Sequence, residues 1–171
     1  YIYNVVPTKG PSSNAAEDEM LVVGVWNKTM SFHKILPDGN TKVHVERSLK
    51  YYPCSMNTAN SGNTKNQYLL VSGSNGKLCL YSKDGVQLSE LIEKDGWISS
   101  NANQLYGDKM LVGTSSGHLQ MSNVTFSSVH TFYKEKYAFR ENLTDIVIHH
   151  LTADRKVRIK CKDIIRSISL Y

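Results

Sequence analysis

Three copies of one strand–turn–strand pattern constrain this chain more than any other feature of its sequence. The clearest copy is YLLVSGSNGKLCLYSKDGVQ, residues 68–87, in which two apolar-rich runs flank a polar turn. Asn75-Gly76 in that turn is the strongest short-range hairpin signal, because a type I′ turn needs a positive φ at both central residues. After the turn, Leu78 and Leu80 occupy alternate positions and therefore project to one side of a strand. The segment thus predicts an antiparallel hairpin.

Two further segments repeat this pattern. MLVVGVWNKTMSF (residues 20–32) and LVGTSSGHLQMS (residues 111–122) align with LLVSGSNGKLCL (residues 69–80). With Met30 and Leu119 as the equivalents of residue 78, the copies are 48 and 41 residues apart. A period of roughly 40–45 residues is typical of four-stranded β-propeller blades. An ordinary antiparallel meander, whose hairpins resemble one another without forming blades, is the alternative.

The propeller interpretation predicts which strands form the blades, which side chains are buried and how many blades the chain holds. We expect the three copies to form the two middle strands of a blade, and we expect four side chains to be buried between blades: Leu78, Leu80, Leu119 and Met121. At roughly 40–45 residues per blade the 171 residues hold about four blades, whereas a common propeller has nearer seven. The chain also opens on Tyr1 rather than Met. The expected fold is therefore all-β, with the blades of an incomplete β-propeller.

The repeat register is lost after residue 125. Residues 128–140 read as a long connection with four aromatic residues, and three later segments read as strands without the earlier turn pattern: 145–151, 156–162 and 164–171. We therefore predict a domain boundary, or a crossover or linker between two propellers, over 126–142, which separates residues 1–125 from residues 143–171.

The best-patterned charged segment is KVRIKCK, residues 156–162. In a strand, one face would carry the four cations Lys156, Arg158, Lys160 and Lys162. Residues 125–171 hold nine Lys or Arg against five Asp or Glu, so most of the net charge of +5 lies there. These four residues are candidates for docking an acidic partner, because a stripe of one sign steers association. A solvated face that protects a sheet edge is the alternative, and nucleic acid is disfavoured because no aromatic residues interleave the stripe.

Nothing in the sequence is typical of an active site or a cofactor site. It contains no nucleophile elbow, no phosphate-binding glycine loop with Lys and no paired carboxylates in one motif. His149 and His150 are adjacent, so in a strand they point to opposite faces and cannot share a metal ion. Cys54, Cys79 and Cys161 are far apart, which fits a reducing compartment. No apolar run approaches the roughly 18–20 residues of a membrane span. We expect no catalytic, cofactor-binding or metal-binding residue and no small-molecule substrate.

Residues 72–81 resemble the core of a WD40 repeat, but Tyr81-Ser82 stands where that family has Trp-Asp. The hydrogen-bond network that the family builds on Trp and Asp therefore cannot be carried over. We expect packing to hold these blades together.

A more specific resemblance covers roughly residues 20–171. The segments VVGVWNKTMSF, YLLVSGSNGKLCLYSKDGVQL, FSSVHTFYKEKYAFRENLTDIVIHHL and KVRIKCKDIIRSISLY follow in the order found in WD40-repeat subunits of the intraflagellar transport A complex. The resemblance implies late blades of a WD40-type propeller over 1–125 and the opening strands of a second propeller over 143–171. It also implies that these paired propellers belong to a non-catalytic scaffold that serves retrograde ciliary transport and cargo entry. It implies other subunits of that complex and cargo adaptors as partners, and a location in the cytoplasm, the cilium or flagellum and the basal body. The alternative is a stand-alone propeller-like module that binds nucleic acid or an acidic peptide through residues 156–162.

Overall fold

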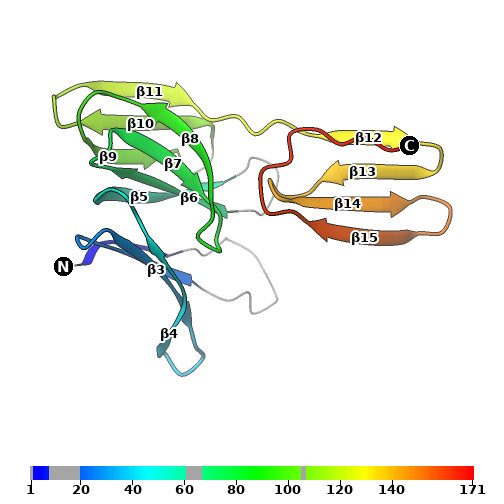
Figure 1. Ribbon diagram of the computed structural model, residues 1–171, viewed down its shortest axis with the longest axis horizontal. Coiled ribbons are helices and arrows are strands. Elements are labelled where there is room, and N and C mark those ends of the chain that lie inside the picture. The colour runs from blue at the N-terminus through cyan, green and yellow to red at the C-terminus, as the bar shows by residue number, and fades with distance from the viewer. Residues whose placement is uncertain (1, 8–19, 61–66, 105–106) are drawn as a thin grey trace. The chain divides into compact units, whose positions relative to one another are not determined.

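The structure is a computed structural model that describes residues 2–7, 20–60, 67–104 and 107–171. In this part of the chain, fifteen strands form four antiparallel sheets and no helix is found (Figure 1). No segment described here therefore has the long apolar helix that a membrane crossing needs. The expected all-β fold is confirmed. The chain divides into two compact units, residues 1–124 and residues 125–171, which we call the first and second units.

The first unit contains three sheets. The first sheet joins in order β1 (Ile2–Pro7), β2 (Met20–Val25), β3 (Thr29–Ile35) and β4 (Thr41–Ser48). The second sheet joins β5 (Pro53–Asn60), β6 (Gln67–Gly73), β7 (Lys77–Tyr81) and β8 (Gln87–Glu93). The third sheet has three strands, β9 (Ile98–Asn103), β10 (Lys109–Thr114) and β11 (Leu119–Asn123). Strand β5 contacts both β1 and β9, so the first strands of successive sheets are neighbours, as in propeller blades.

The second unit is one sheet of four strands. It joins in order β12 (His130–Tyr133), β13 (Lys136–Arg140), β14 (Asp145–His150) and β15 (Arg155–Lys160). The predicted linker over 126–142 is wrong in so far as β12 and β13 lie within it. Aromatic residues favour strands, and here they flank a short turn in which Lys134 takes the left-handed φ of 53° usually given to glycine. The strand predicted over 164–171 is also wrong, because those residues form no strand.

The β2–β3, β6–β7 and β10–β11 turns share one backbone geometry. In each turn an N–H donates to the carbonyl three residues earlier, at 3.1 Å from Lys28 to Val25, 3.2 Å from Gly76 to Gly73 and 3.1 Å from Gly117 to Thr114. These three donor residues have φ values of 65°, 72° and 84°. Asn75 is not among the described residues with positive φ, so the expected type I′ turn is wrong. The loop is the longer kind, in which a turn is followed by one left-handed residue.

Lys28 is unusual in this position. A left-handed φ brings the Cβ atom of a non-glycine residue close to the following carbonyl oxygen, which costs about 1–2 kcal/mol. The two equivalent turns avoid that cost with Gly76 and Gly117. The first sheet therefore retains a lysine where the fold alone favours glycine.

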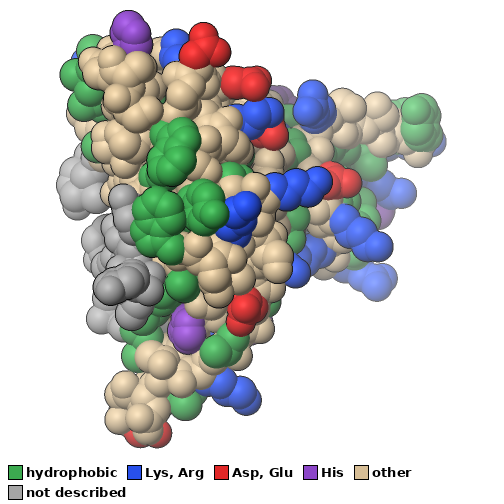
Figure 2. Space-filling view, turned by 60° about the vertical axis from the view of Figure 1, so that its left-hand side comes forward, with side chains coloured by type: hydrophobic (Ala, Val, Ile, Leu, Met, Phe, Trp, Pro, Cys, Tyr) green, Lys and Arg blue, Asp and Glu red, His purple; other side chains and the backbone are tan. Residues whose placement is uncertain are grey.

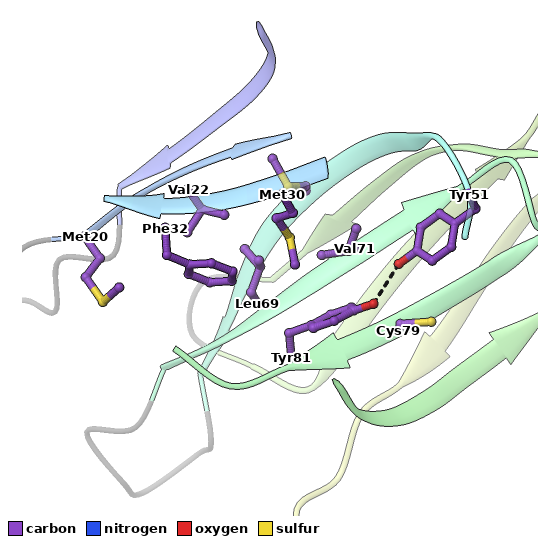
Figure 3. Packing of buried hydrophobic residues seen from close by; sticks show 10 residues of the cluster. Met20, Val22, Met30, Phe32, Tyr51, Leu69, Val71, Cys79 and Tyr81 are labelled. Atoms are coloured by element: carbon purple, nitrogen blue, oxygen red, sulfur yellow. Dashed lines mark hydrogen bonds between the residues drawn. The ribbon is translucent and has the colours of Figure 1, made fainter. Parts of the chain in front are cut away.

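An apolar core joins the first and second sheets (Figure 3). It contains the buried residues Met20, Val22, Met30, Phe32, Tyr51, Met56, Leu69, Val71, Cys79 and Tyr81. Phe32 is 1% exposed, and burying a side chain of this size stabilises a fold by roughly 1.5–3 kcal/mol. Leu78 and Leu80 alternate with Cys79 and Tyr81 on β7, and they are buried as expected, at 0% and 3% exposed.

Hydrogen bonds join the second and third sheets where β5 and β9 are neighbours. The Asn101 side chain is almost fully buried, and its amide nitrogen donates to the Ser55 carbonyl and the Ser72 hydroxyl, each at 3.0 Å. The Asn57 amide donates to the Asn101 side-chain oxygen at 3.0 Å. Buried polar groups are stable only with such partners. Polar contacts as well as packing therefore hold these blades.

The prediction that Leu119 and Met121 are buried is wrong. They are 71% and 65% exposed, and Leu111, the cross-strand partner of Met121, is 37% exposed. The opposite face of the third sheet is the buried one, because Met110 and Val112, which alternate with Leu111 on β10, are 3% and 1% exposed. In the described part of the chain, the outer face of β10 and β11 is therefore open to solvent at Leu119 and Met121. Alternation placed these side chains on one face correctly but could not show that the face is uncovered.

Two tyrosines and a glutamine join the linker after the first sheet to the second sheet. The Tyr81 hydroxyl donates to Gln87 Oε1 at 3.0 Å, so the Tyr51 hydroxyl, 3.0 Å from Tyr81 Oη, is the donor to Tyr81. Burial raises the pKa of Tyr51 far above its ordinary value, and it raises the pKa of Tyr81 as well. Both hydroxyls therefore remain neutral donors, and they connect β7, β8 and the linker without the Trp-Asp pair.

Two glycines with positive φ separate the cost of a left-handed backbone from the cost of a close contact. Gly39 and Gly76 have φ values of 83° and 72°, but a Cβ atom at residue 76 would lie 2.2 Å from the Lys94 carbonyl oxygen, whereas one at residue 39 meets nothing within 4 Å. We expect Gly39→Ala to lower the free energy of unfolding by about 1 kcal/mol through backbone conformation alone. Gly76→Ala should lower the free energy of unfolding by about 3 kcal/mol or more, because the linker between β8 and β9, which contains Lys94, must also move. Urea unfolding measures the free energy of unfolding of both variants. Equal losses would contradict the close contact between residue 76 and the Lys94 carbonyl.

The three thiols should differ in reactivity. Cys54 and Cys79 are buried, whereas Cys161 is partly exposed. Burial raises the pKa of Cys79 to about 11 and also raises the pKa of Cys54. Because the thiolate is the reactive form, iodoacetamide at mildly alkaline pH should alkylate Cys161 first and Cys79 last, as followed by mass spectrometry. In urea the three rates should converge, and faster labelling of Cys79 than of Cys161 in the folded chain would show that this core is open.

Candidate functional site

Strand β15 is an edge strand of the fourth sheet and carries most of the predicted docking residues. Lys156, Arg158 and Lys160 lie opposite alternate residues of β14, so their side chains share one face. Lys162 lies two residues beyond the end of the strand, and strand pairing does not place it on that face. All four cations are exposed. The structure thus brings three of the four candidates together in a row.

Acidic groups lie beside this row. The Arg158 guanidinium forms an ion pair with the Glu141 carboxylate, and their side chains are 60% and 37% exposed. An exposed pair of this kind contributes no more than about 1 kcal/mol. Asp145 is buried and lies opposite Lys160, and its Oδ2 accepts a hydrogen bond from the Asn142 amide at 3.0 Å. The positive row is therefore partly balanced on the side facing β14.

Aromatic side chains share the face of the basic row. Across the sheet, Tyr137 and Lys156 both lie opposite His149, while Phe139 and Arg158 both lie opposite Val147. The rings of Tyr137 and Phe139 are stacked, with centroids 5.4 Å apart. Sequence reasoning missed this arrangement because it treated residues 126–142 as a linker. The alternation of aromatic and polar residues around Lys134 is the signal that could have revealed it.

The two adjacent histidines lie in different surroundings. His149 lies opposite Lys156 and His150 lies opposite Arg155 on β15. Because adjacent residues of a strand alternate, the two histidine side chains point to opposite faces of the sheet. His149 Nε2 lies 2.9 Å from Asp154 Oδ1, and this hydrogen bond lowers the pKa of the Asp154 carboxyl. In the described ranges, no group of three or more His, Cys, Asp or Glu side chains is arranged to hold a metal ion.

Solved structures share the fold of the chain. A polycomb repressive complex 2 structure from Chaetomium thermophilum aligns with a TM-score of 0.60, covering 88% of this chain and 37% of the matched chain at 11% identity. A structure of BBS1N in complex with ARL6DN aligns with a TM-score of 0.55, covering 74% of this chain and 34% of the other at 19% identity. Identities this low show a common fold and carry no information about function.

Sequence comparison is more specific. Residues 130–171 match the family described as IFT122 second beta-propeller. Relatives named intraflagellar transport protein 122 homolog are 31% identical over 159 residues in Mus musculus and 32% identical over 154 residues in Homo sapiens. These alignments cover 93% and 90% of this chain, and the chain spans 13% and 12% of the two relatives. With WD-repeat β-propeller blades as its fold, the chain is therefore a homologue of intraflagellar transport protein 122 over most of its length.

Proposed function

We propose that the chain is part of a non-catalytic WD-repeat scaffold subunit of the intraflagellar transport A complex. The observation that carries this proposal is the similarity to intraflagellar transport protein 122 along nine-tenths of the chain. In this role the protein acts in retrograde ciliary transport and in the entry of cargo into cilia. Its partners are the other subunits of the complex and cargo adaptors, and it works in the cytoplasm, at the basal body and in the cilium or flagellum.

The division of the chain fits this role. We propose that residues 1–125 are late blades of one propeller and that the following residues open a second one. The match to a second-propeller family begins at residue 130, close to the start of the second unit at Thr125. This agreement supports a connection between the propellers that is shorter than the predicted segment 126–142.

Purification of the full-length protein, tagged at its chromosomal locus, tests the scaffold role. We expect the other subunits of the intraflagellar transport A complex to co-purify in comparable amounts. Depletion of the protein should leave transport particles accumulated at ciliary tips, because retrograde movement would fail. An untagged strain is the control. A protein that purifies without any transport subunit would rule out this function.

We further propose that the exposed row on β15 docks an acidic surface of a partner subunit or cargo adaptor. Three exposed cations on one strand face support it, since a one-sign surface raises association rates. The edge position of β15 also fits a purely protective role, because charged side chains discourage edge-to-edge pairing of sheets. Reversal of charge separates these two roles.

The double change Lys156→Glu with Lys162→Glu reverses one cation of the row and the predicted docking cation just beyond β15, and it leaves the Arg158–Glu141 ion pair intact. We expect it to slow association of the full-length protein with the remaining complex at low salt, and less so at moderate salt. The free energy of unfolding should stay within about 0.5 kcal/mol, as is usual for surface changes. Lys42→Glu with Lys83→Glu, two exposed lysines of the first unit, makes the same charge change elsewhere. If wild type and both variants bind equally at both salt concentrations, β15 has only the protective role.

A second candidate function is binding of a nucleic acid or an acidic peptide by a propeller-like module that acts alone. Tyr137 and Phe139 favour it, because they place aromatic rings on the face of the basic row where the segment itself has none. Fluorescence anisotropy with a labelled oligonucleotide over a salt series tests it. A steep loss of affinity with salt that the β15 variant abolishes would support nucleic-acid binding, and no binding at low salt would exclude it.

A further inference from the structure

Three aromatic residues form an exposed cluster at one end of the first unit, which we call the aromatic platform. Trp26 lies in the β2–β3 turn, Tyr52 directly precedes β5 and Trp97 directly precedes β9. Ring centroids are 5.0 Å apart for Trp26–Tyr52, 6.2 Å for Trp26–Trp97 and 6.4 Å for Tyr52–Trp97. The two tryptophans are 39% and 43% exposed. Figure 2 shows one face of the molecule, and hydrophobic side chains gather near its middle, beside a lysine or arginine.

The same pair of hydrogen bonds fixes the backbone at Tyr52 and at Trp97. The Tyr52 N–H donates to Ser74 Oγ at 3.0 Å, and the Ser74 N–H donates to the Tyr52 carbonyl at 3.0 Å. In the next sheet the Trp97 N–H donates to Ser115 Oγ at 3.2 Å, and the Ser115 N–H donates to the Trp97 carbonyl at 2.8 Å. The platform is thus positioned before any partner arrives. A preorganised aromatic surface loses little conformational entropy on binding.

Lys28 adds a positive charge to the platform. Its ammonium nitrogen lies 4.8 Å from the centroid of the Tyr52 ring. Its φ of 65° is the conformation for which the equivalent positions use Gly76 and Gly117. Backbone strain of this kind concentrates at functional sites. Lys28 combines a strained backbone with a position beside exposed aromatic rings. We infer that its positive charge contributes to binding a ligand.

The geometry limits what that ligand can be. The rings are in contact with one another, so no ring of a ligand enters between them, and only their exposed faces and edges are available. Lys28 already occupies the position that a cationic ligand would take over Tyr52. The adjoining linkers 49–52 and 94–97 add Lys50, Lys94 and Asp95, so positive charge prevails. Aromatic surfaces of this kind bind extended segments through proline and apolar side chains.

We propose that the aromatic platform binds an extended acidic segment of a partner protein. A proline or aromatic side chain of that segment lies on Trp26 and Trp97, and a neighbouring carboxylate pairs with the Lys28 ammonium. This surface lies on the first unit, whereas β15 lies on the second. The proposal therefore goes beyond the scaffold role and stands or falls independently of it.

The chain contains two tryptophans, and both belong to the platform. Tryptophan emission of the chain consequently reports on the platform and not on β15. The probe is a random-peptide phage library, selected on the immobilised chain and followed by synthesis of an enriched peptide. We expect enriched peptides to combine Asp or Glu with Pro or an aromatic residue, and titration with such a peptide to change tryptophan emission saturably. Enrichment without acidic residues, or binding that leaves the emission unchanged, would overturn the proposal.

Lys28→Gly is the decisive variant because it removes the ammonium and relieves the backbone at the same time. Its thermal stability should equal or exceed that of wild type, so loss of binding cannot be ascribed to misfolding. We expect the enriched peptide to bind at least about tenfold more weakly, as for a central contact of an interface. Lys134→Gly is the matched control, because Lys134 also has a positive φ of 53° and lies 5.1 Å from the ring of Tyr133 in the second unit. Equal weakening by both variants would mean that only net charge matters and would reject the platform as the site.

Discussion

The burial of the first sheet against the second is the interaction on which the rest of the first unit depends. A four-stranded sheet has two faces, and it cannot shield both from water by itself. Met30 and Phe32 supply the apolar surface of one sheet, and Leu69, Val71 and Tyr81 supply that of the next. Tyr51 belongs to the same core, although it lies in the linker between the sheets. Packing of the two blades therefore also fixes where the chain passes from one blade to the next.

The position of the linkers explains how a surface can be built from residues that are distant in sequence. Tyr51 is buried and hydrogen-bonded to Tyr81, so its neighbour Tyr52 must emerge at the end of the sheet. A serine in the following turn then binds the backbone of Tyr52, and another serine repeats this contact at Trp97. Blade repetition thus brings equivalent positions to one end of the unit. The residue type at these two positions can vary, because the serine contacts involve only their backbone.

The second unit carries a different kind of surface. Its charged residues lie on an edge strand, where unpaired backbone groups would otherwise invite another strand. The same cations that discourage such pairing form the row that we propose docks an acidic partner, and one of them, Arg158, is ion-paired with Glu141. The scaffold role that we propose requires several distinct contact surfaces. An aromatic platform on one unit and a basic row on the other are two surfaces with different chemistry and different expected sensitivity to salt.

The turn and the alternation of Leu78 and Leu80 were sufficient to predict the hairpin and the burial of these two side chains, because strand geometry is local, and the repeat spacing of 48 and 41 residues predicted the blades. The same rule, applied to the sequence alone, put Lys156, Arg158 and Lys160 on one face. Tertiary structure decided everything that depends on neighbours. Whether Leu119 and Met121 are covered is set by the presence of another sheet and not by their own strand. The aromatic face beside β15 needs β12 and β13 to pair with β14, and the platform joins Trp26, Tyr52 and Trp97 from three separate sheets and linkers. Contacts between residues this far apart arise from how sheets pack, which no local pattern in the sequence encodes.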